Sequence, residues 1–163
     1  MNPDRLLVFV ASQGGQGGGA VRIYRLNTPG GSLELVAEDV TIADPHFLVV
    51  DPSRGLVFVS NDEGSREKGP TGRVHAFRFD RANVGLALLS SRPTGGTTPC
   101  HMSLSVDGRW LLVSNFRGPG DVGSGGVLPV GTDGNLGPAC GVIRHAGSSV
   151  HPTRQLCSHI HSI

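Results

Sequence analysis

The chain has 163 residues, among them 25 glycines and 11 prolines, and its formal net charge at pH 7 is +1. Charged residues make up only 17% of it, which is fewer than a disordered chain carries, so the composition indicates a folded, turn-rich β protein. The sequence has no basic run and few aromatic residues, and we therefore expect no nucleic-acid partner.

The N-terminal apolar run and the cysteines bear on location. The run from Leu6 to Ala11 is too short for the core of a signal peptide or for a membrane span, so we expect no membrane partner. Cys100, Cys140 and Cys157 are odd in number and lack the spacing of a paired motif. Reduced thiols fit this pattern, and we predict a cytoplasmic protein.

Three short apolar runs mark a repeated unit with a period of about fifty residues. The runs are 7–11, 56–61 and 111–115, and turns at 51–55 and 106–110 precede the second and third. Each run is followed by an alternating segment (19–27, 72–80 and 126–131) and then by a closing segment (32–36, 86–90 and 136–143). Period-two alternation is typical of half-buried antiparallel strands. The sequence therefore predicts an all-β fold, a β-propeller with about three four-stranded antiparallel blades.

The repeats suggest approximate boundaries at 1–43, 44–97 and 98–157, with a further blade beginning at 158–163. A propeller closes with about four to eight blades, so three units leave open strand edges. We expect either a fragment of a longer protein or association through the open blade edges. Pro129 would remove a ladder donor from its strand, which predicts that this strand lies at an edge or is irregular.

Two other segments are interpreted as structural loops and not as functional sites. Gly15 to Ala20 is similar to a dinucleotide-binding loop, but the next residues alternate as a strand where that motif needs a helix, so we interpret it as a hairpin loop. Asp62 and Glu63, with Arg66 and Lys68 nearby, could be an acid/base pair. A solvated, charged hairpin loop is the favoured interpretation.

The densest polar cluster lies at the C-terminus, in the segments 144–145, 151–155 and 157–163. In an extended segment Cys157, His159 and His161 share one face. Imidazoles beside an arginine and a glutamine suit general-base and oxyanion-stabilising roles in the hydrolysis of an ester or lactone. The cluster could instead serve hydrogen bonding in a loop. A Cys/His metal site is less favoured because no carboxylate or second cysteine pair completes it, so we expect no metal and no cofactor.

The sequence resembles the lactonase family of seven-bladed β-propellers, which includes cycloisomerase-type 6-phosphogluconolactonases and carboxymuconate-lactonising enzymes. The resemblance covers essentially the whole chain, and its most specific parts are His151-Pro-Thr-Arg-Gln155 and His159-Ile-His-Ser162. Further matching stretches are 94–101, 107–115, 133–137 and 144–148. The resemblance implies about three of seven blades and a small-molecule lactone as substrate. A muconate-type cycloisomerase and a non-catalytic binding scaffold remain alternatives.

The resemblance also implies site residues. The family's catalytic histidine lies in the second motif, so that role falls to His159 or His161, and matching the first residues of successive blades favours His159. Its arginine and glutamate partners would come from later blades, so the 163-residue chain is expected to be inactive alone. Arg154 would assist catalysis. The remaining candidates for substrate binding are Gln155, His101, His46 and Asn115. The two histidines His46 and His101 could equally bind neighbouring backbone.

Overall fold

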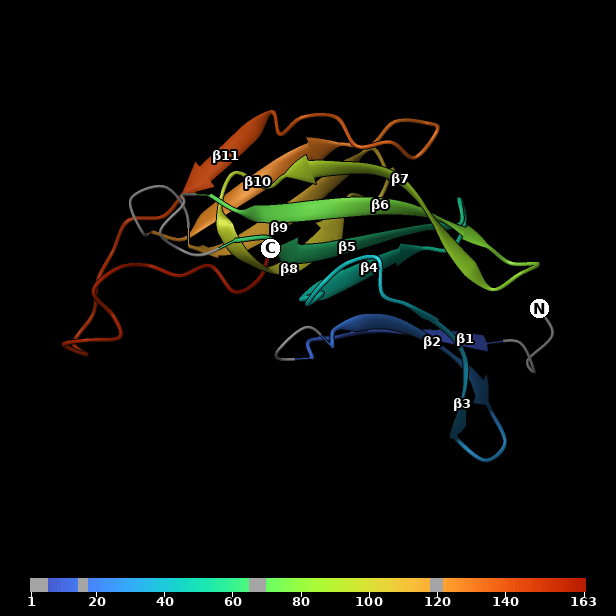
Figure 1. Cartoon of the computed structure of the whole chain (residues 1–163). Helices are drawn as coiled ribbons and strands as arrows, with labels where there is room; N and C mark the ends of the chain where they lie inside the picture. The colour runs from blue at the N-terminus through green and yellow to red at the C-terminus, as the bar shows by residue number, and fades with distance from the viewer. Residues whose placement is uncertain (1–5, 15–17, 65–69, 118–121) are drawn as a thin grey trace.

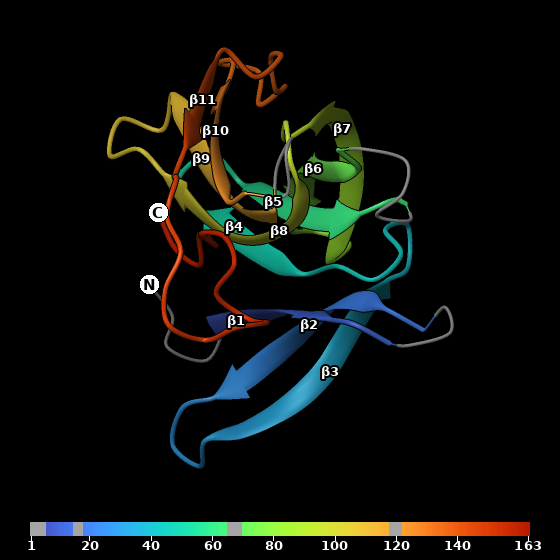
Figure 2. The ribbon, with the colours of Figure 1, turned by 90° about the vertical axis from the view of Figure 1, so that its left-hand side faces the viewer.

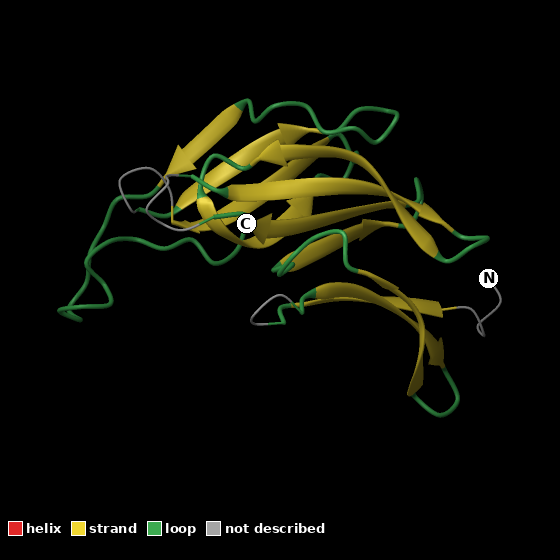
Figure 3. Cartoon of the chain, viewed as in Figure 1, coloured by secondary structure: helices red, strands yellow, loops and turns green. Residues whose placement is uncertain are grey.

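The computed structural model describes residues 6–14, 18–64, 70–117 and 122–163, and the regular structure among them is β-strand (Figures 1 and 3). The strands are β1 (Leu6–Ser12), β2 (Ala20–Asn27), β3 (Ser32–Asp39), β4 (Phe47–Asp51), β5 (Leu56–Asp62), β6 (Gly72–Asp80), β7 (Gly85–Pro93), β8 (Thr97–Leu104), β9 (Trp110–Arg117), β10 (Ser124–Pro129) and β11 (Gly141–Arg144). No helix that could cross a membrane occurs in these ranges.

The strands form three antiparallel meanders, in which each strand pairs with its neighbour in the chain. The sheets are β1-β2-β3, β4-β5-β6-β7 and β8-β9-β10-β11. Figure 1 shows them following one another from the blue N-terminal sheet to the orange C-terminal one. The predicted all-β, bladed architecture is confirmed. The first sheet has three strands among the described residues, where a four-stranded blade was predicted.

Three turns are closed in the same way. Two of them join the first and second strands of the middle and C-terminal sheets, and the third follows β10. An aspartate side chain accepts a hydrogen bond from a backbone N–H two residues later, and this bond closes the turn locally. The pairs are Asp51 with Ser53 (3.0 Å), Asp107 with Arg109 (3.1 Å) and Asp133 with Asn135 (2.9 Å). A glycine in each turn has a positive φ, which a side chain would disfavour. These are Gly55 (63°), Gly108 (69°) and Gly134 (91°).

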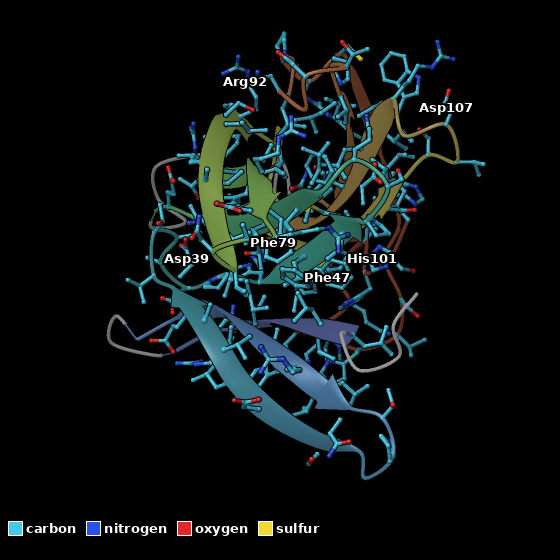
Figure 4. The ribbon with its side chains drawn as sticks, turned by 90° about the vertical axis from the view of Figure 1, so that its right-hand side faces the viewer. Asp39, Phe47, Phe79, Arg92, His101 and Asp107 are labelled. Carbon is cyan, nitrogen blue, oxygen red and sulfur yellow. The ribbon has the colours of Figure 1, made fainter. Side chains whose placement is uncertain are left out.

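The core consists of two apolar clusters, one on each side of the middle sheet. The first joins the N-terminal and middle sheets and includes Val21, Ile23, Val57, Val59 and Phe77. The second joins the middle and C-terminal sheets and includes Leu56, Phe58, Met102, Leu111, Val113 and Leu128. Because β5 contributes alternate side chains to both clusters, its residues from Leu56 to Asn61 are all buried. Phe79 of β6 belongs to the first cluster and Phe47 of β4 packs against the second; both are labelled in Figure 4.

Two details of the C-terminal sheet differ from the prediction. The strand with Pro129 is not at an edge, because β10 pairs with both β9 and β11. Pro129 is its last residue, opposite Trp110, where a missing donor interrupts little of the ladder. The closing strand begins at Gly141 rather than at Leu136, which instead forms an isolated bridge with Val130.

The glycine-rich segment connects two paired strands. Gly15 to Gly17 lie outside the described residues, but β1 pairs with β2 from Leu6↔Leu26 to Ser12↔Ala20. The segment after the glycines is therefore a strand, as predicted, and not the helix that a dinucleotide-binding loop needs.

Candidate functional site

An open pocket of about 860 Å³ lies between the end of β9 and the C-terminal segment. Four of the seven predicted site residues line it: Arg154, Gln155, His159 and His161. In Figure 2 the red C-terminal segment descends from β11 and turns back before the chain ends. This path brings the two sequence motifs of the C-terminus, residues 151–155 and 159–162, to one pocket.

His159 is held at two points by Phe116 of β9. The two rings are stacked, with centroids 4.1 Å apart, and the His159 Nδ1 lies 3.1 Å from the Phe116 carbonyl oxygen. Since a carbonyl oxygen can only accept, the proton of a neutral His159 sits on Nδ1. Nε2 therefore carries the lone pair that a general base needs, and the Cys157 Sγ lies 3.8 Å from it.

His161 contacts the same phenyl ring from another side. Its ring lies edge-on to Phe116, with centroids 5.1 Å apart and an angle of 68°. His161 is exposed, whereas His159 is half-buried. The structure thus brings both candidate histidines to the pocket and fixes His159 more firmly.

The segment 151–155 is a turn that is closed by hydrogen bonds among its own residues. The His151 Nδ1 accepts hydrogen bonds from the backbone N–H of Arg154 (3.1 Å) and of Thr153 (3.4 Å). The Gln155 side-chain oxygen accepts from the His151 N–H at 3.1 Å. Gln155 therefore helps to shape the turn. The exposed Arg154 guanidinium borders the pocket and forms no ion pair within the described part of the chain.

The described lining of the pocket includes two cationic side chains. Arg117, Arg154 and three histidines line it, and none of its described lining residues is an aspartate or glutamate. A concave surface with one sign of charge attracts ligands of the opposite sign. The arrangement therefore suits an anionic small molecule.

A close backbone approach holds the C-terminal segment against the third sheet. The Gly123 N–H donates to the Ser158 carbonyl oxygen at 2.7 Å, and the Ser158 hydroxyl donates to the His145 carbonyl oxygen. A Cβ at Gly123 would lie 2.6 Å from the Ile160 nitrogen, so glycine is required there. Ile160 is also fixed from β8, because its carbonyl oxygen lies 3.2 Å from the Cys100 thiol.

The other three predicted residues do not line this pocket. His101 packs on Phe47, with ring centroids 4.7 Å apart, and its Nδ1 accepts from the Ile163 N–H at 3.3 Å (Figure 4). His46 is half-buried beside β4, and its backbone N–H donates to Ser60. His46 directly precedes β4, and His101 lies in the middle of β8.

Asn115 is buried, and both the oxygen and the nitrogen of its side-chain amide form hydrogen bonds. Its Oδ1 accepts from the Thr94 hydroxyl at 2.7 Å, and its Nδ2 lies 3.4 Å from the Thr94 carbonyl oxygen and 3.3 Å from the Ser124 hydroxyl. Asn61, at the matching place of β5, donates to the Ala43 carbonyl oxygen at 3.2 Å. In both sheets this contact links the second strand to the segment that precedes the first strand.

Asp62 and Glu63 bind neighbouring strands. Asp62 accepts hydrogen bonds from the Thr71 hydroxyl and from the backbone N–H of Thr98, the latter at 2.7 Å. Glu63 forms an ion pair with Arg73 at 3.2 Å. Their predicted neighbours Arg66 and Lys68 lie outside the described residues.

Sequence reasoning missed three side chains of the pocket: Phe116, Arg117 and His151. Phe116 follows the strand motif that ends at Asn115, but nothing local indicates that a segment more than forty residues later folds onto it. His151 stands in the His-Pro-Thr-Arg-Gln motif, which was a usable signal. Among the described residues, no group of three histidine, cysteine, aspartate or glutamate side chains is arranged to hold a metal ion.

The family described as lactonase, 7-bladed β-propeller matches residues 7–163. The chain belongs to this family. A 6-phosphogluconolactonase of Formosa agariphila is 27% identical over 145 residues, covering 89% of this chain and 39% of the relative. The 6-phosphogluconolactonase of Bacillus subtilis is 24% identical over 147 residues, again covering 39% of the relative. The chain thus spans about two fifths of these curated relatives' length.

The solved structures agree with the fold. The periplasmic gluconolactonase PpgL of Pseudomonas aeruginosa superimposes with a TM-score of 0.78 and is 37% identical. The match covers 96% of this chain and 42% of that protein. The three sheets therefore correspond to part of a larger lactonase propeller.

Proposed function

We propose that this chain contributes the histidine-bearing part of a lactonase that hydrolyses a sugar lactone such as 6-phosphogluconolactone. One observation carries the proposal: the Phe116 carbonyl oxygen holds Nδ1 of His159 at 3.1 Å, which leaves the Nε2 lone pair in a pocket that Arg154 also lines. The names of the Formosa agariphila and Bacillus subtilis relatives support this substrate class.

In the proposed reaction, His159 Nε2 accepts a proton from a water molecule while the water oxygen attacks the lactone carbonyl carbon. The carbonyl oxygen gains negative charge, which the Arg154 guanidinium can stabilise if it does not bind the phosphate group. When the tetrahedral intermediate collapses, the bond between the carbonyl carbon and the ring oxygen breaks. The protonated His159 returns its proton to that oxygen, and a hydroxy acid is released.

A chimaera tests the function directly. Residues 7–163 replace the matched segment of the Bacillus subtilis relative, and hydrolysis of 6-phosphogluconolactone is followed against the uncatalysed rate. We expect activity that His159→Ala lowers by about a hundredfold or more, since general-base catalysis contributes on that scale. His145→Ala is the matched control, because His145 is exposed and outside the pocket. Full activity of the His159→Ala chimaera would remove His159 from the mechanism. Formation of carboxymuconolactone when carboxymuconate is supplied as the substrate would identify a cycloisomerase instead.

The 163-residue chain alone is expected to be inactive, since the family resemblance places further catalytic groups in other blades. A cytoplasmic location is part of the proposal and is supported by the odd number of cysteines. The Pseudomonas aeruginosa relative is described as periplasmic, so fractionation of the producing cell is the measurement that decides.

A further inference from the structure

A second, smaller pocket of about 360 Å³ lies beside the one already described. The two pockets share five lining residues of the C-terminal segment, among them Arg154 and His159. Residues 147–149 and Ser158 line the second pocket only. A molecule that extends from one pocket into the other would therefore pass both the Arg154 guanidinium and the imidazole of His159.

The segment 146–148 is held between two hydrogen bonds. Before it, the His145 carbonyl oxygen accepts from the Ser158 hydroxyl. After it, the Ser149 N–H donates to the Gln155 carbonyl oxygen at 2.9 Å. Both bonds join this segment to the stretch 155–158, which leads directly to the candidate histidines. The side chains at 148 and 149 are thus presented on a backbone that is tied to the rest of the site.

The Ser148 and Ser149 hydroxyls have unused hydrogen-bonding capacity. Both residues are exposed, and neither hydroxyl bonds to any group in the part of the chain that the structure describes. The Arg154 guanidinium has no ion-pair partner there either. The described residues around this pocket include no aspartate or glutamate. A guanidinium with hydroxyl donors beside it, and with no carboxylate to compete, suits a phosphate group.

We propose that the second pocket binds the phosphate group of the substrate, through the Arg154 guanidinium and the hydroxyls of Ser148 and Ser149. This inference rests on the proposed function, because it assigns one part of the same substrate. The lactone ring would lie in the larger pocket, with its carbonyl carbon near the Nε2 of His159. Arg154 would then bind the phosphate and not the carbonyl oxygen.

The shared wall of the two pockets gives the subsite a role in specificity. A phosphorylated sugar lactone carries its carbonyl group and its phosphate at opposite ends of one carbon chain. Only such a molecule would use the base and the serine hydroxyls together. An unphosphorylated lactone would fill the larger pocket alone, so the enzyme would prefer the phosphorylated substrate.

Isothermal titration calorimetry on the chimaera tests the subsite without catalysis. It compares 6-phosphogluconate, the product of the proposed reaction, with gluconate; both carry the carboxylate, so only the phosphate differs. We expect the phosphorylated acid to bind about tenfold more tightly or better, and the double substitution Ser148→Ala with Ser149→Ala to remove most of this preference. A preference that the double substitution leaves unchanged overturns the proposal.

Ser32→Ala is the matched control for the serine substitutions. Ser32 is exposed at the start of β3, outside both pockets, and its hydroxyl forms no hydrogen bond with the described residues. Its loss should leave the binding of both acids as it is in the unchanged chimaera. Circular dichroism checks that each variant is folded.

Steady-state kinetics separates this inference from the proposed function. The double substitution should raise the KM for 6-phosphogluconolactone by about tenfold or more and that for unphosphorylated gluconolactone by less than about twofold. Ser148→Asp, which adds a negative charge, should raise the first KM further. Equal changes for both lactones, or none, would overturn the subsite in a working lactonase. Loss of the phosphate preference on binding together with no hydrolysis would overturn both proposals, whereas phosphate-selective binding without hydrolysis would support the subsite and overturn the function.

Discussion

The imidazole of His159 lies parallel to the phenyl ring of Phe116, with an angle of 5° between their planes. The carbonyl group of the same Phe116 binds the imidazole Nδ1. One residue of β9 therefore fixes both the plane and the tautomer of the proposed base. Phe116 is a positioning residue, since it acts through His159.

Phe116→Ala should remove the stacking contact but keep the backbone carbonyl. We expect kcat of the lactonase chimaera to fall by about threefold to tenfold, because an aromatic pair contributes about 0.5–1.5 kcal/mol. The KM should change little. Steady-state kinetics measures the split, and partial recovery in Phe116→Tyr, which retains a ring, serves as the control. An unchanged kcat in Phe116→Ala would show that stacking does not position the base.

Arg154→Gln should distinguish phosphate binding from stabilisation of the oxyanion. If the guanidinium binds phosphate, the KM for 6-phosphogluconolactone should rise by about tenfold or more, since hydrogen bonds to charged groups contribute about 1.5–3 kcal/mol. The KM for an unphosphorylated gluconolactone should stay the same. Equal losses of kcat on both lactones would assign Arg154 to the oxyanion instead.

His75 predicts a pH dependence of folding stability. It is almost fully buried, its Nε2 donates to the Asn61 Oδ1 at 2.9 Å, and burial, with a smaller effect of Arg73, lowers its pKa from 6.5 to about 4. Between these two values the unfolded chain binds a proton that the folded chain does not. Stability is therefore complete above about pH 6.5, falls as the pH drops toward 4, and then levels off.

The size of this effect is on the order of 3 kcal/mol. Urea unfolding at pH 7.5 and at pH 4.5 measures it, and His75→Gln should reduce the difference between the two pH values. His145→Gln, at an exposed position, should leave the difference as in the unchanged protein. An identical pH dependence in His75→Gln would show that other groups cause it.

Asn115→Ala should destabilise the fold by about 1–3 kcal/mol, because it leaves the buried Thr94 groups without their partner. Urea denaturation checks this value. Asn83→Ala is the comparison, because Asn83 is exposed and bonds only to Asp80 in its own turn, so its loss should cost much less. A stable Asn115→Ala protein with a raised KM would restore Asn115 to the substrate site.

Strand periodicity and the aspartate-glycine turns were sufficient to predict the sheets, because both depend on residues close in the chain. The three-stranded form of the first sheet among the described residues and the interior place of β10 were not predictable in this way. Both are set by pairing between strands, and Pro129 is tolerated only because the ladder ends there. At the site, the histidines and Arg154 are recognisable from their motif, whereas Phe116 enters through a contact across forty-three positions.

The central position of the middle sheet determines which parts of the molecule should unfold last. The β5 backbone is covered on one side by the apolar cluster that includes Phe77 and on the other by the cluster that includes Leu111. Detachment of the N-terminal or the C-terminal sheet therefore still leaves one side of β5 protected. The amide protons of β5 should therefore exchange with solvent last, by global unfolding, while those of β3 and β11 exchange through local fraying.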